Sequence, residues 1–224
     1  MSMLSNLELI RRVPLFSMLT ASQAEGVADA VVKRRFKRGE LIVEQGKKTN
    51  ALFILLTGRA RVVTSDSRGR EVILATLTPG DHLGEMSLID NEPHSATVRA
   101  EVTTDTLMLG RIEFARCLPE NTSMAYAVMK GLVQRLRSAD RKIESLALMD
   151  VYGRVARALL EFATSEVNGQ MVIKERISRQ DVAKMVGASR EMVSRVMKDL
   201  EERGFFETLP DGSTLIKART TALN

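Results

Sequence analysis

The feature that most constrains the fold is a long, glycine-poor stretch over residues 121–149, in which apolar residues alternate at spacings of four and three. These positions are Ala125, Met129, Leu132, Leu136, Ala139, Ile143 and Leu146. Three heptads of this kind predict a long α-helix with an apolar seam. Because basic and polar residues fill the other positions, we expect a parallel two-stranded coiled coil that joins two copies of the chain. Packing of the helix on the core of its own domain is the alternative.

Composition indicates an ordinary globular protein. The chain has 224 residues, of which 44% are hydrophobic and 27% charged, enough for two folded regions beside the helix. The chain contains no run of about 18 apolar residues, so the sequence predicts no membrane span. The first eight residues lack the pattern of a signal peptide. We therefore expect a soluble, cytoplasmic protein. The single cysteine, Cys117, excludes a disulfide framework or a cysteine-rich metal site within one chain, and we expect it to be a buried apolar residue.

Residues 37–109 consist of short β-branched and apolar runs separated by glycines, three of which lie 11 residues apart. This pattern predicts an all-β sandwich or barrel-like roll. The expected strands are 40–44, 51–56, 61–64 and 71–77, with a hairpin turn at 66–69. We expect helical structure in the first 30 residues, with Leu7, Ile10, Leu15 and Leu19 packing inward, and a helix over 111–118 that Pro119 ends.

The last 75 residues predict a winged helix-turn-helix. The expected elements are a helix over 151–164, a turn at Asn168–Gly169, a strand over 171–173, a helix capped by Ser178, a turn at Gly187, a helix capped by Ser189 that runs to about Arg203, and a hairpin over 205–217. The predicted fold class is therefore α+β. The predicted domains are a roll over 1–120, a dimerisation helix over 121–149 and a winged helix-turn-helix over 150–224.

Four residues of the second helix in this motif are candidates for contacting DNA bases: Arg190, Glu191, Ser194 and Arg195. The last three share one helical face, with Arg190 at its N-terminal edge. Arginine binds guanine O6 and N7 through two hydrogen bonds, and glutamate accepts from cytosine N4. A solvated face with a Glu191–Arg195 ion pair is the alternative. The net charge of +5 is spread along the chain, so DNA binding must rest on these placed residues.

Several motifs together resemble those of the CRP/FNR family of bacterial transcription regulators. They are GDHLGE at 80–85, SATVRA at 95–100, LMDVYGRVA at 148–156, ISRQDVA at 177–183 and VGASREMVSR at 186–195. The resemblance covers residues of roughly 10 to 218 in one order. It implies a cyclic-nucleotide-binding-like roll, a homodimer that binds palindromic double-stranded DNA through two recognition helices in successive major grooves, and transcription control through contact with RNA polymerase.

The resemblance assigns roles to residues of the helix-turn-helix. Arg190, Glu191 and Arg195 fall where cAMP receptor proteins read TGTGA half-sites, and Ser194 falls where the FNR branch carries its serine. We therefore expect a TGTGA/TTGA-like half-site. Ser178, Gln180 and Ser189 are expected at helix N-termini, where hydroxyl and backbone N–H groups suit DNA phosphate.

The resemblance matches the effector pocket of the roll only in part. Gly84, Glu85 and Ser95 match the residues that hold the ribose hydroxyl and the cyclic phosphate in cAMP-binding members. His94 stands where those members carry arginine, and it lacks the fixed charge and the two-pronged geometry of a guanidinium. The adenine-contacting Thr-Ser pair is replaced by Ala139 and Asp140.

Three interpretations of the pocket remain open. It binds cAMP with His94 in place of arginine; it binds another nucleotide such as cyclic di-GMP, whose guanine N1–H and N2–H could donate to Asp140; or it binds nothing, and the protein is a ligand-independent regulator. In the third case His94 is a surface loop residue and Asp140 pairs with Arg137 or Arg141.

No arrangement of catalytic residues or metal ligands is recognisable, so we predict a protein that is not an enzyme and has no metal site. A dimeric nucleotide-sensing scaffold that does not bind DNA is the remaining alternative, and the complete set of Arg190, Glu191 and Arg195 argues against it. If a nucleotide controls the protein, we expect it to shift the population between dimers with different spacings of the recognition helices, through a hinge at Met149–Asp150.

Overall fold

The computed structural model describes residues 5–17, 19–120, 122–163, 165–167, 170–174 and 177–217. The chain divides into two compact units, residues 1–136 and 137–224. The first unit is rich in strands and the second contains a helix-turn-helix with a small sheet, so the α+β prediction is confirmed. Across the described ranges, no helix is long and apolar enough to cross a membrane.

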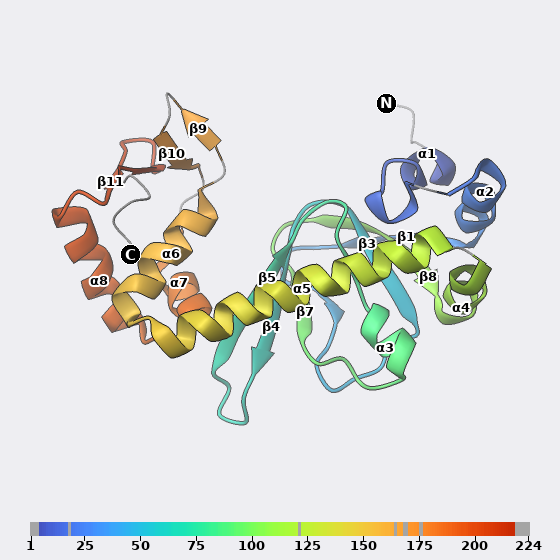
Figure 1. Ribbon diagram of the computed structural model, residues 1–224, viewed down its shortest axis with the longest axis horizontal. Coiled ribbons are helices and arrows are strands. Elements are labelled where there is room, and N and C mark those ends of the chain that lie inside the picture. The colour runs from blue at the N-terminus through green and yellow to red at the C-terminus, as the bar shows by residue number, and fades with distance from the viewer. Residues whose placement is uncertain are drawn as a thin grey trace. The chain divides into compact units, whose positions relative to one another are not determined.

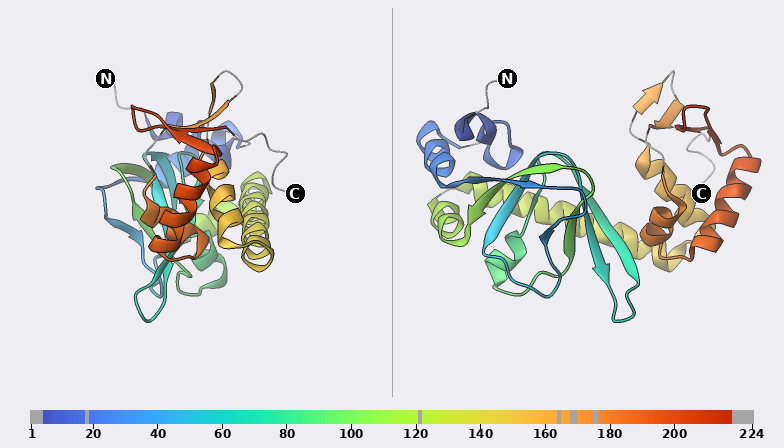
Figure 2. Two further views of the ribbon diagram at one scale, coloured as in Figure 1. Left: turned by 90° about the vertical axis from the view of Figure 1, so that its left-hand side faces the viewer. Right: turned by 180° about the vertical axis from the view of Figure 1, so that it is seen from behind.

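Two antiparallel four-stranded sheets form the roll of the first unit (Figures 1 and 2). One sheet has the order β1 (Val32–Phe36), β8 (Thr104–Gly110), β3 (Ala51–Thr57) and β6 (His82–Leu83). The other has the order β2 (Leu41–Val43), β7 (Thr97–Ala100), β4 (Ala60–Ser65) and β5 (Glu71–Leu77). The four runs predicted as strands correspond to β2, β3, β4 and β5, and the Asp66–Gly69 turn joins β4 to β5.

Strand β3 has no exposed face at its centre because alternate side chains enter two different cores. Phe53 and Leu55 belong to the core between the sheets, together with Leu77, Leu83 and Val98. Leu52 and Ile54 belong to the core under the helices. A strand buried on both faces reads as a continuous apolar run, and the sequence of β3, ALFILLT, has this form.

Helices cover the outer side of the sheet that contains β3 (Figure 1). They are α1 (Asn6–Ile10), α2 (Ala21–Ala30), α4 (Arg111–Glu120) and the first part of α5 (Thr122–Leu148), with a 3-10 turn at Pro14–Phe16. Ile10 and Leu15 are buried in this core and Leu7 and Leu19 pack against it, as predicted. The expectation that Pro119 ends the fourth helix is wrong, because α4 continues to Glu120. The side chain of Cys117 lies outside the described residues.

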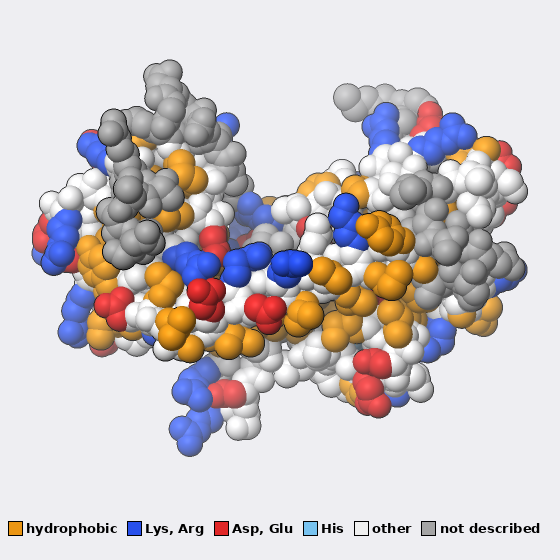
Figure 3. Space-filling model, in the orientation of Figure 1, with side chains coloured by type: hydrophobic (Ala, Val, Ile, Leu, Met, Phe, Trp, Pro, Cys, Tyr) orange, Lys and Arg blue, Asp and Glu red, His pale blue; other side chains and the backbone are white. Residues whose placement is uncertain are grey.

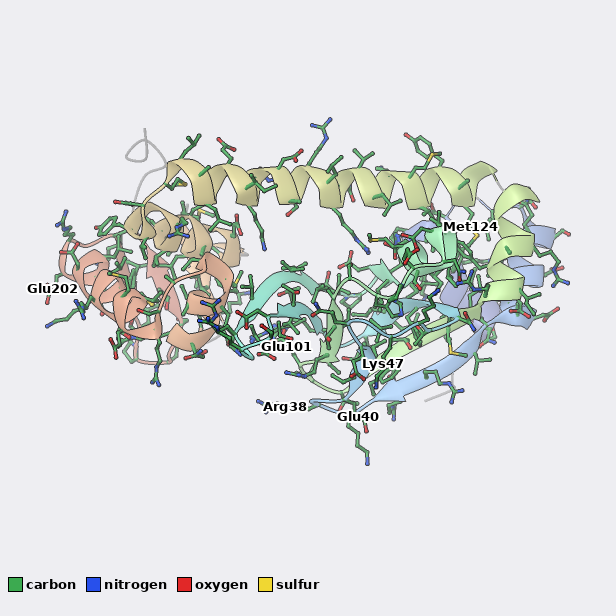
Figure 4. The ribbon with its side chains drawn as sticks, turned by 90° about the horizontal axis from the view of Figure 1, so that it is seen from below. Arg38, Glu40, Lys47, Glu101, Met124 and Glu202 are labelled. Atoms are coloured by element: carbon green, nitrogen blue, oxygen red, sulfur yellow. The ribbon has the colours of Figure 1, made fainter. Side chains whose placement is uncertain are left out.

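Within the first unit, one face of helix α5 is buried in the roll core and another apolar face is exposed. The exposed face differs from the predicted seam. Met124 and Val128 are buried in the roll's own core, and Leu132 packs against the same core rather than lying on a free seam. Figure 4 shows Met124 on the side of α5 that faces the roll. The exposed apolar face carries Tyr126, Met129, Val133 and Leu136 at spacings of 3, 4 and 3. A heptad seam is therefore present, shifted by one position at Tyr126 and Val133.

The second unit is a winged helix-turn-helix. Helices α6 (Val151–Phe162), α7 (Arg179–Val186) and α8 (Arg190–Glu202) share one core with strands β10 (Gln170–Ile173), β11 (Phe206–Thr208) and β12 (Thr214–Ile216). These strands form a sheet of the order β11, β12, β10 and β9 (Ser165–Val167). Helix α6 ends two residues before the predicted Thr164, and the predicted turn Asn168–Gly169 lies outside the described residues. The domain boundaries at 120/121 and 149/150 stay predictions, although α5 ends at Leu148 and Asp150 caps α6.

Candidate functional site

The helix-turn-helix is defined by two serine caps and one glycine. The Ser178 hydroxyl accepts from the N–H of Asp181 at 3.0 Å and begins α7. The Ser189 hydroxyl accepts from the N–H of Met192 at 3.2 Å and begins α8. Gly187 ends α7 with φ +63°, a backbone conformation that glycine adopts without steric cost. Arg154 of α6 donates to the carbonyl of Val186 at 2.7 Å and fixes this turn from below.

Helix α8 turns its apolar side inward and its charged side to solvent. Val193, Val196 and Leu200 are buried in the core of the unit. Arg190, Glu191 and Arg195 are exposed, and Ser194 is half-buried. Among the described residues, none of the three charged side chains forms an ion pair, so the alternative of a Glu191–Arg195 pair is not realised. The charged groups are available to an external partner.

The residues predicted to contact phosphate lie at helix N-termini. Ser178 and Ser189 are the two caps, and Gln180 is the second residue of α7; all three are exposed. Backbone N–H groups in the first turn of a helix have no intrahelical partners and attract anions. The geometry is compatible with the phosphate role, which stays a prediction.

The effector site predicted for the roll contains a buried carboxylate at the start of α3 (Glu85–Asp90). Glu85 has no exposed surface, and its Oε1 accepts from Nη1 of Arg135 at 2.5 Å. The other guanidinium nitrogen of Arg135 donates to the carbonyl of His82. Burial raises the pKa of Glu85, and the charge of Arg135 opposes this shift. Arg135 is a residue that sequence reasoning missed, because the pair is separated by 50 residues and no local pattern connects them.

Glu85 retains one unused acceptor. Its Oε2 is buried and has no hydrogen-bond partner within the described part of the chain. A buried carboxylate oxygen without a partner is costly, and a sugar hydroxyl would satisfy it. Gly84 allows this carboxylate its position, because its φ is +92° and a Cβ there would lie 2.5 Å from the carbonyl oxygen of Ala51. These two residues fit the ribose side of a cyclic nucleotide.

His94 does not replace an arginine in this conformation. It is only 8% exposed, and its Nε2 lies 2.5 Å from the hydroxyl of Thr49. Burial lowers the pKa of His94, which favours the neutral imidazole. The interpretation of His94 as a surface loop residue is therefore wrong. The adjacent Ser95 is exposed. At the position where the resemblance expects an arginine, the roll therefore carries a side chain without a fixed charge.

A second buried histidine lies where α5 meets the roll. His82 is 8% exposed, and a Cβ at Gly131 would lie 2.7 Å from its Cε1. Burial, with a contribution from Arg135, lowers the pKa of His82 to about 4, so the imidazole is neutral. Gly131 therefore permits the close approach of α5 to β6. Sequence reasoning missed this role, because one glycine in a helical pattern carries no sign of its neighbour.

Asp140 belongs to the second unit and is exposed on α5. Within the described residues it forms no ion pair with Arg137 or Arg141, so the expected alternative of such a pair is not realised. Among the described residues, no group of three or more His, Cys, Asp or Glu side chains could hold a metal ion.

Comparison with known protein families covers both halves of the chain. Residues 33–121 match the cyclic nucleotide-binding domain, and residues 153–220 match the Crp-like helix-turn-helix domain. The chain is 33% identical over 193 residues to the cAMP-activated global transcriptional regulator Vfr of Pseudomonas aeruginosa, spanning 82% of this chain and 88% of that protein. The chain belongs to the CRP/FNR family of transcription regulators.

A second relative and a solved structure are also similar to this chain. The cAMP-activated global transcriptional regulator CRP of Salmonella typhimurium is 29% identical over 181 residues, 78% of this chain and 84% of that protein. The solved structure of the c-di-GMP responsive global regulator CLP of Xanthomonas campestris superposes with a TM-score of 0.76 at 24% identity, over 90% of this chain and all of that one. The family consists of transcription regulators, not enzymes, and homodimers are typical of it.

Proposed function

We propose that the protein is a homodimer that binds a palindromic DNA site through α8, with TGTGA/TTGA-like half-sites. The observation that carries the proposal is the exposed set of Arg190, Glu191 and Arg195 on a capped helix within a helix-turn-helix, which forms no ion pair in the part of the chain that the structure describes. In the assigned roles, Arg190 and Arg195 donate to guanine, Glu191 accepts from cytosine and Ser194 contacts the neighbouring base.

The supporting contacts follow the same geometry. Ser178, Gln180 and Ser189 bind phosphates at the N-termini of α7 and α8. The helix over residues 121–149 joins the two copies through its exposed apolar face. Two recognition helices related by a two-fold axis then contact successive major grooves. Regulation of transcription by such a dimer requires contact with RNA polymerase, which we include in the proposal.

The effector proposed for the roll is a cyclic nucleotide held on its sugar side by Gly84 and Glu85. Its phosphate would be met by Ser95 and by neutral His94. The relatives Vfr and CRP are named as cAMP-activated, which supports cAMP. The guanine edge of cyclic di-GMP offers two donors that would suit a carboxylate, and Asp140 is the exposed carboxylate that the sequence predicts for this role. A ligand that binds one dimer conformation better than another would shift the population and change DNA affinity.

Two experiments separate these parts. Fluorescence anisotropy with a TGTGA palindrome should give at least about 1,000-fold tighter binding than a scrambled duplex of equal length. Equal affinities would contradict the DNA proposal.

Calorimetric titration with cAMP, cGMP and cyclic di-GMP tests the pocket, repeated on Glu85→Gln, His94→Ala and Asp140→Ala. Binding of one nucleotide that weakens about tenfold or more in Glu85→Gln supports the pocket. Absence of binding by all three contradicts it and favours a ligand-independent regulator, and the DNA proposal would survive.

A further inference from the structure

Helix α3 presents a small apolar face beside the exposed face of α5. Glu85, Ser87 and Leu88 of α3 point inward and are buried. Met86 and Ile89, which are three residues apart, point outward and are 48% and 54% exposed. Exposure of two large apolar side chains to water is unfavourable for such a short helix.

The two faces adjoin because α3 is fixed against α5 from inside. Leu88 lies in the same core cluster as Met124 and Val128. Glu85 pairs with Arg135, which lies about two turns after Val128 on α5. Arg111 also donates to the carbonyls of Ser87 and Leu88, at 2.9 and 3.3 Å, so α3 is anchored to the roll.

Together these faces form one apolar surface, which we call the α3–α5 face. Its members are Met86, Ile89, Tyr126, Met129, Val133 and Leu136, each between 48% and 62% exposed. Figure 3 shows hydrophobic side chains gathered over α5 and α3. Monomeric soluble proteins rarely expose a contiguous apolar surface of this kind, and such surfaces mark interaction sites.

We propose that a second copy of the chain covers the whole α3–α5 face, so that the dimer interface includes α3 and does not consist of paired α5 helices alone. Continuity supports this occupant, because four of the six residues lie on the helix that joins the copies in the proposed function, on which this inference rests. Charge at the rim supports it too. Asp90 and Glu92 are exposed beside α3, and Lys130 is exposed on α5, so a self-complementary interface can pair acidic rim with basic rim.

The arrangement has a consequence for the effector pocket. Glu85, which belongs to the proposed effector site, is buried, and the next residue, Met86, is 48% exposed on the α3–α5 face. A ligand that moves Glu85 would therefore also move Met86, the neighbouring residue in the proposed dimer contact. The helix that holds the sugar-binding carboxylate is in this account also part of the subunit interface.

The test uses the full-length protein and compares Ile89→Glu with Val102→Glu. Val102 is 41% exposed and lies in the turn between β7 and β8, where the neighbouring residues belong to the β3–β4 turn. Sedimentation equilibrium should show dimerisation weakened about tenfold or more by Ile89→Glu, because a carboxylate would be buried in an apolar contact, and unchanged by Val102→Glu. Unchanged dimerisation in Ile89→Glu would overturn the inference.

A second measurement avoids introducing a charged side chain at position 89. A photo-crosslinking benzoylphenylalanine at position 89 should give a covalent dimer on irradiation, and the same group at position 102 should not. A wild-type dimer that gives no intermolecular product from position 89 would contradict the role of α3 and leave the α5 interface standing. A wild-type protein that is monomeric at all concentrations would contradict the proposed dimer itself.

Discussion

The recognition helix and the roll pocket match the CRP/FNR pattern to different degrees. On α8, all four predicted base-contacting residues are present, and the three charged ones are exposed and unpaired among the described residues. In the roll, Gly84 and Glu85 are in place, but His94 is buried against Thr49 and carries no fixed charge. Each region has its own hydrophobic core. The comparison teaches that the DNA-binding surface and the sensing pocket of such a chain can change independently.

The largest expected effect is on the recognition helix. Arg195→Ala removes a bidentate base contact from both half-sites of a symmetric dimer. Each contact is worth about 1–3 kcal/mol, so the palindrome should be bound about 2–6 kcal/mol more weakly, while non-specific binding changes little. Anisotropy titrations measure both. Lys198→Ala, on the same helix but paired with Glu202 at 3.6 Å, is the control and should leave specificity intact. Equal losses in the two variants would break the assignment of α8.

Adding a methyl group at Gly84 should strongly reduce the stability of the roll. Gly84→Ala combines a positive φ of +92° with a clash against the Ala51 carbonyl, and should destabilise the roll by about 2–5 kcal/mol. Gly69→Ala has a similar φ of +75° but open space around it, and should cost only about 1 kcal/mol. Hydrogen exchange followed by mass spectrometry should show faster exchange in roll peptides of Gly84→Ala. Equal acceleration in α8 peptides would contradict two independent cores.

Stability should fall with acid through His82. Its pKa is about 4 in the folded protein, against an ordinary value of about 6.5, so the unfolded chain binds the proton more readily between these values. The free energy of unfolding therefore decreases as pH falls below about 6.5, by about 2 kcal/mol at pH 5. Burial shifts the pKa of His94 in the same direction.

Urea unfolding followed by circular dichroism at pH 7.5 and pH 5 tests this. His82→Phe should lose about 2 kcal/mol less than the wild type between the two values, because it has no imidazole to protonate. An identical pH dependence in the variant would show that His82 is not the group responsible.

The smallest of these effects is expected at His94, where the roll differs from the CRP/FNR pattern. His94→Arg restores the guanidinium that the pocket lacks, and should strengthen cAMP binding by about 1–2 kcal/mol through a charged contact to the cyclic phosphate. His94→Gln, which remains neutral, is the matched control for calorimetry. If both variants bind cAMP equally, the missing charge is not what limits the pocket.

Local patterns in the sequence were sufficient to predict much of the fold. Alternating glycines and apolar runs predicted β2 to β5, and the caps Ser178 and Ser189 predicted the starts of α7 and α8. These features depend on neighbours in the chain. The exposed face of α5 was predicted one position away at Tyr126 and Val133, because the burial of Leu132 is decided by the roll core, which a heptad count does not contain.

The candidate site divides in the same way. The residues of α8 could be named in advance because a helix places them at fixed spacing. Arg135, the partner of Glu85, could not, because the ion pair connects residues 50 positions apart. The buried state of His94 depends on Thr49, which lies 45 positions earlier.

Selection of bound duplexes from a randomised pool, followed by sequencing, tests whether the dimer reads a palindromic site through α8. We expect the wild-type protein to enrich an inverted repeat with TGTGA/TTGA-like half-sites whose centres lie about one helical turn apart. Arg195→Ala should not enrich this motif. Enrichment of no motif, or of one without two-fold symmetry, would contradict a dimer that reads DNA through two copies of α8.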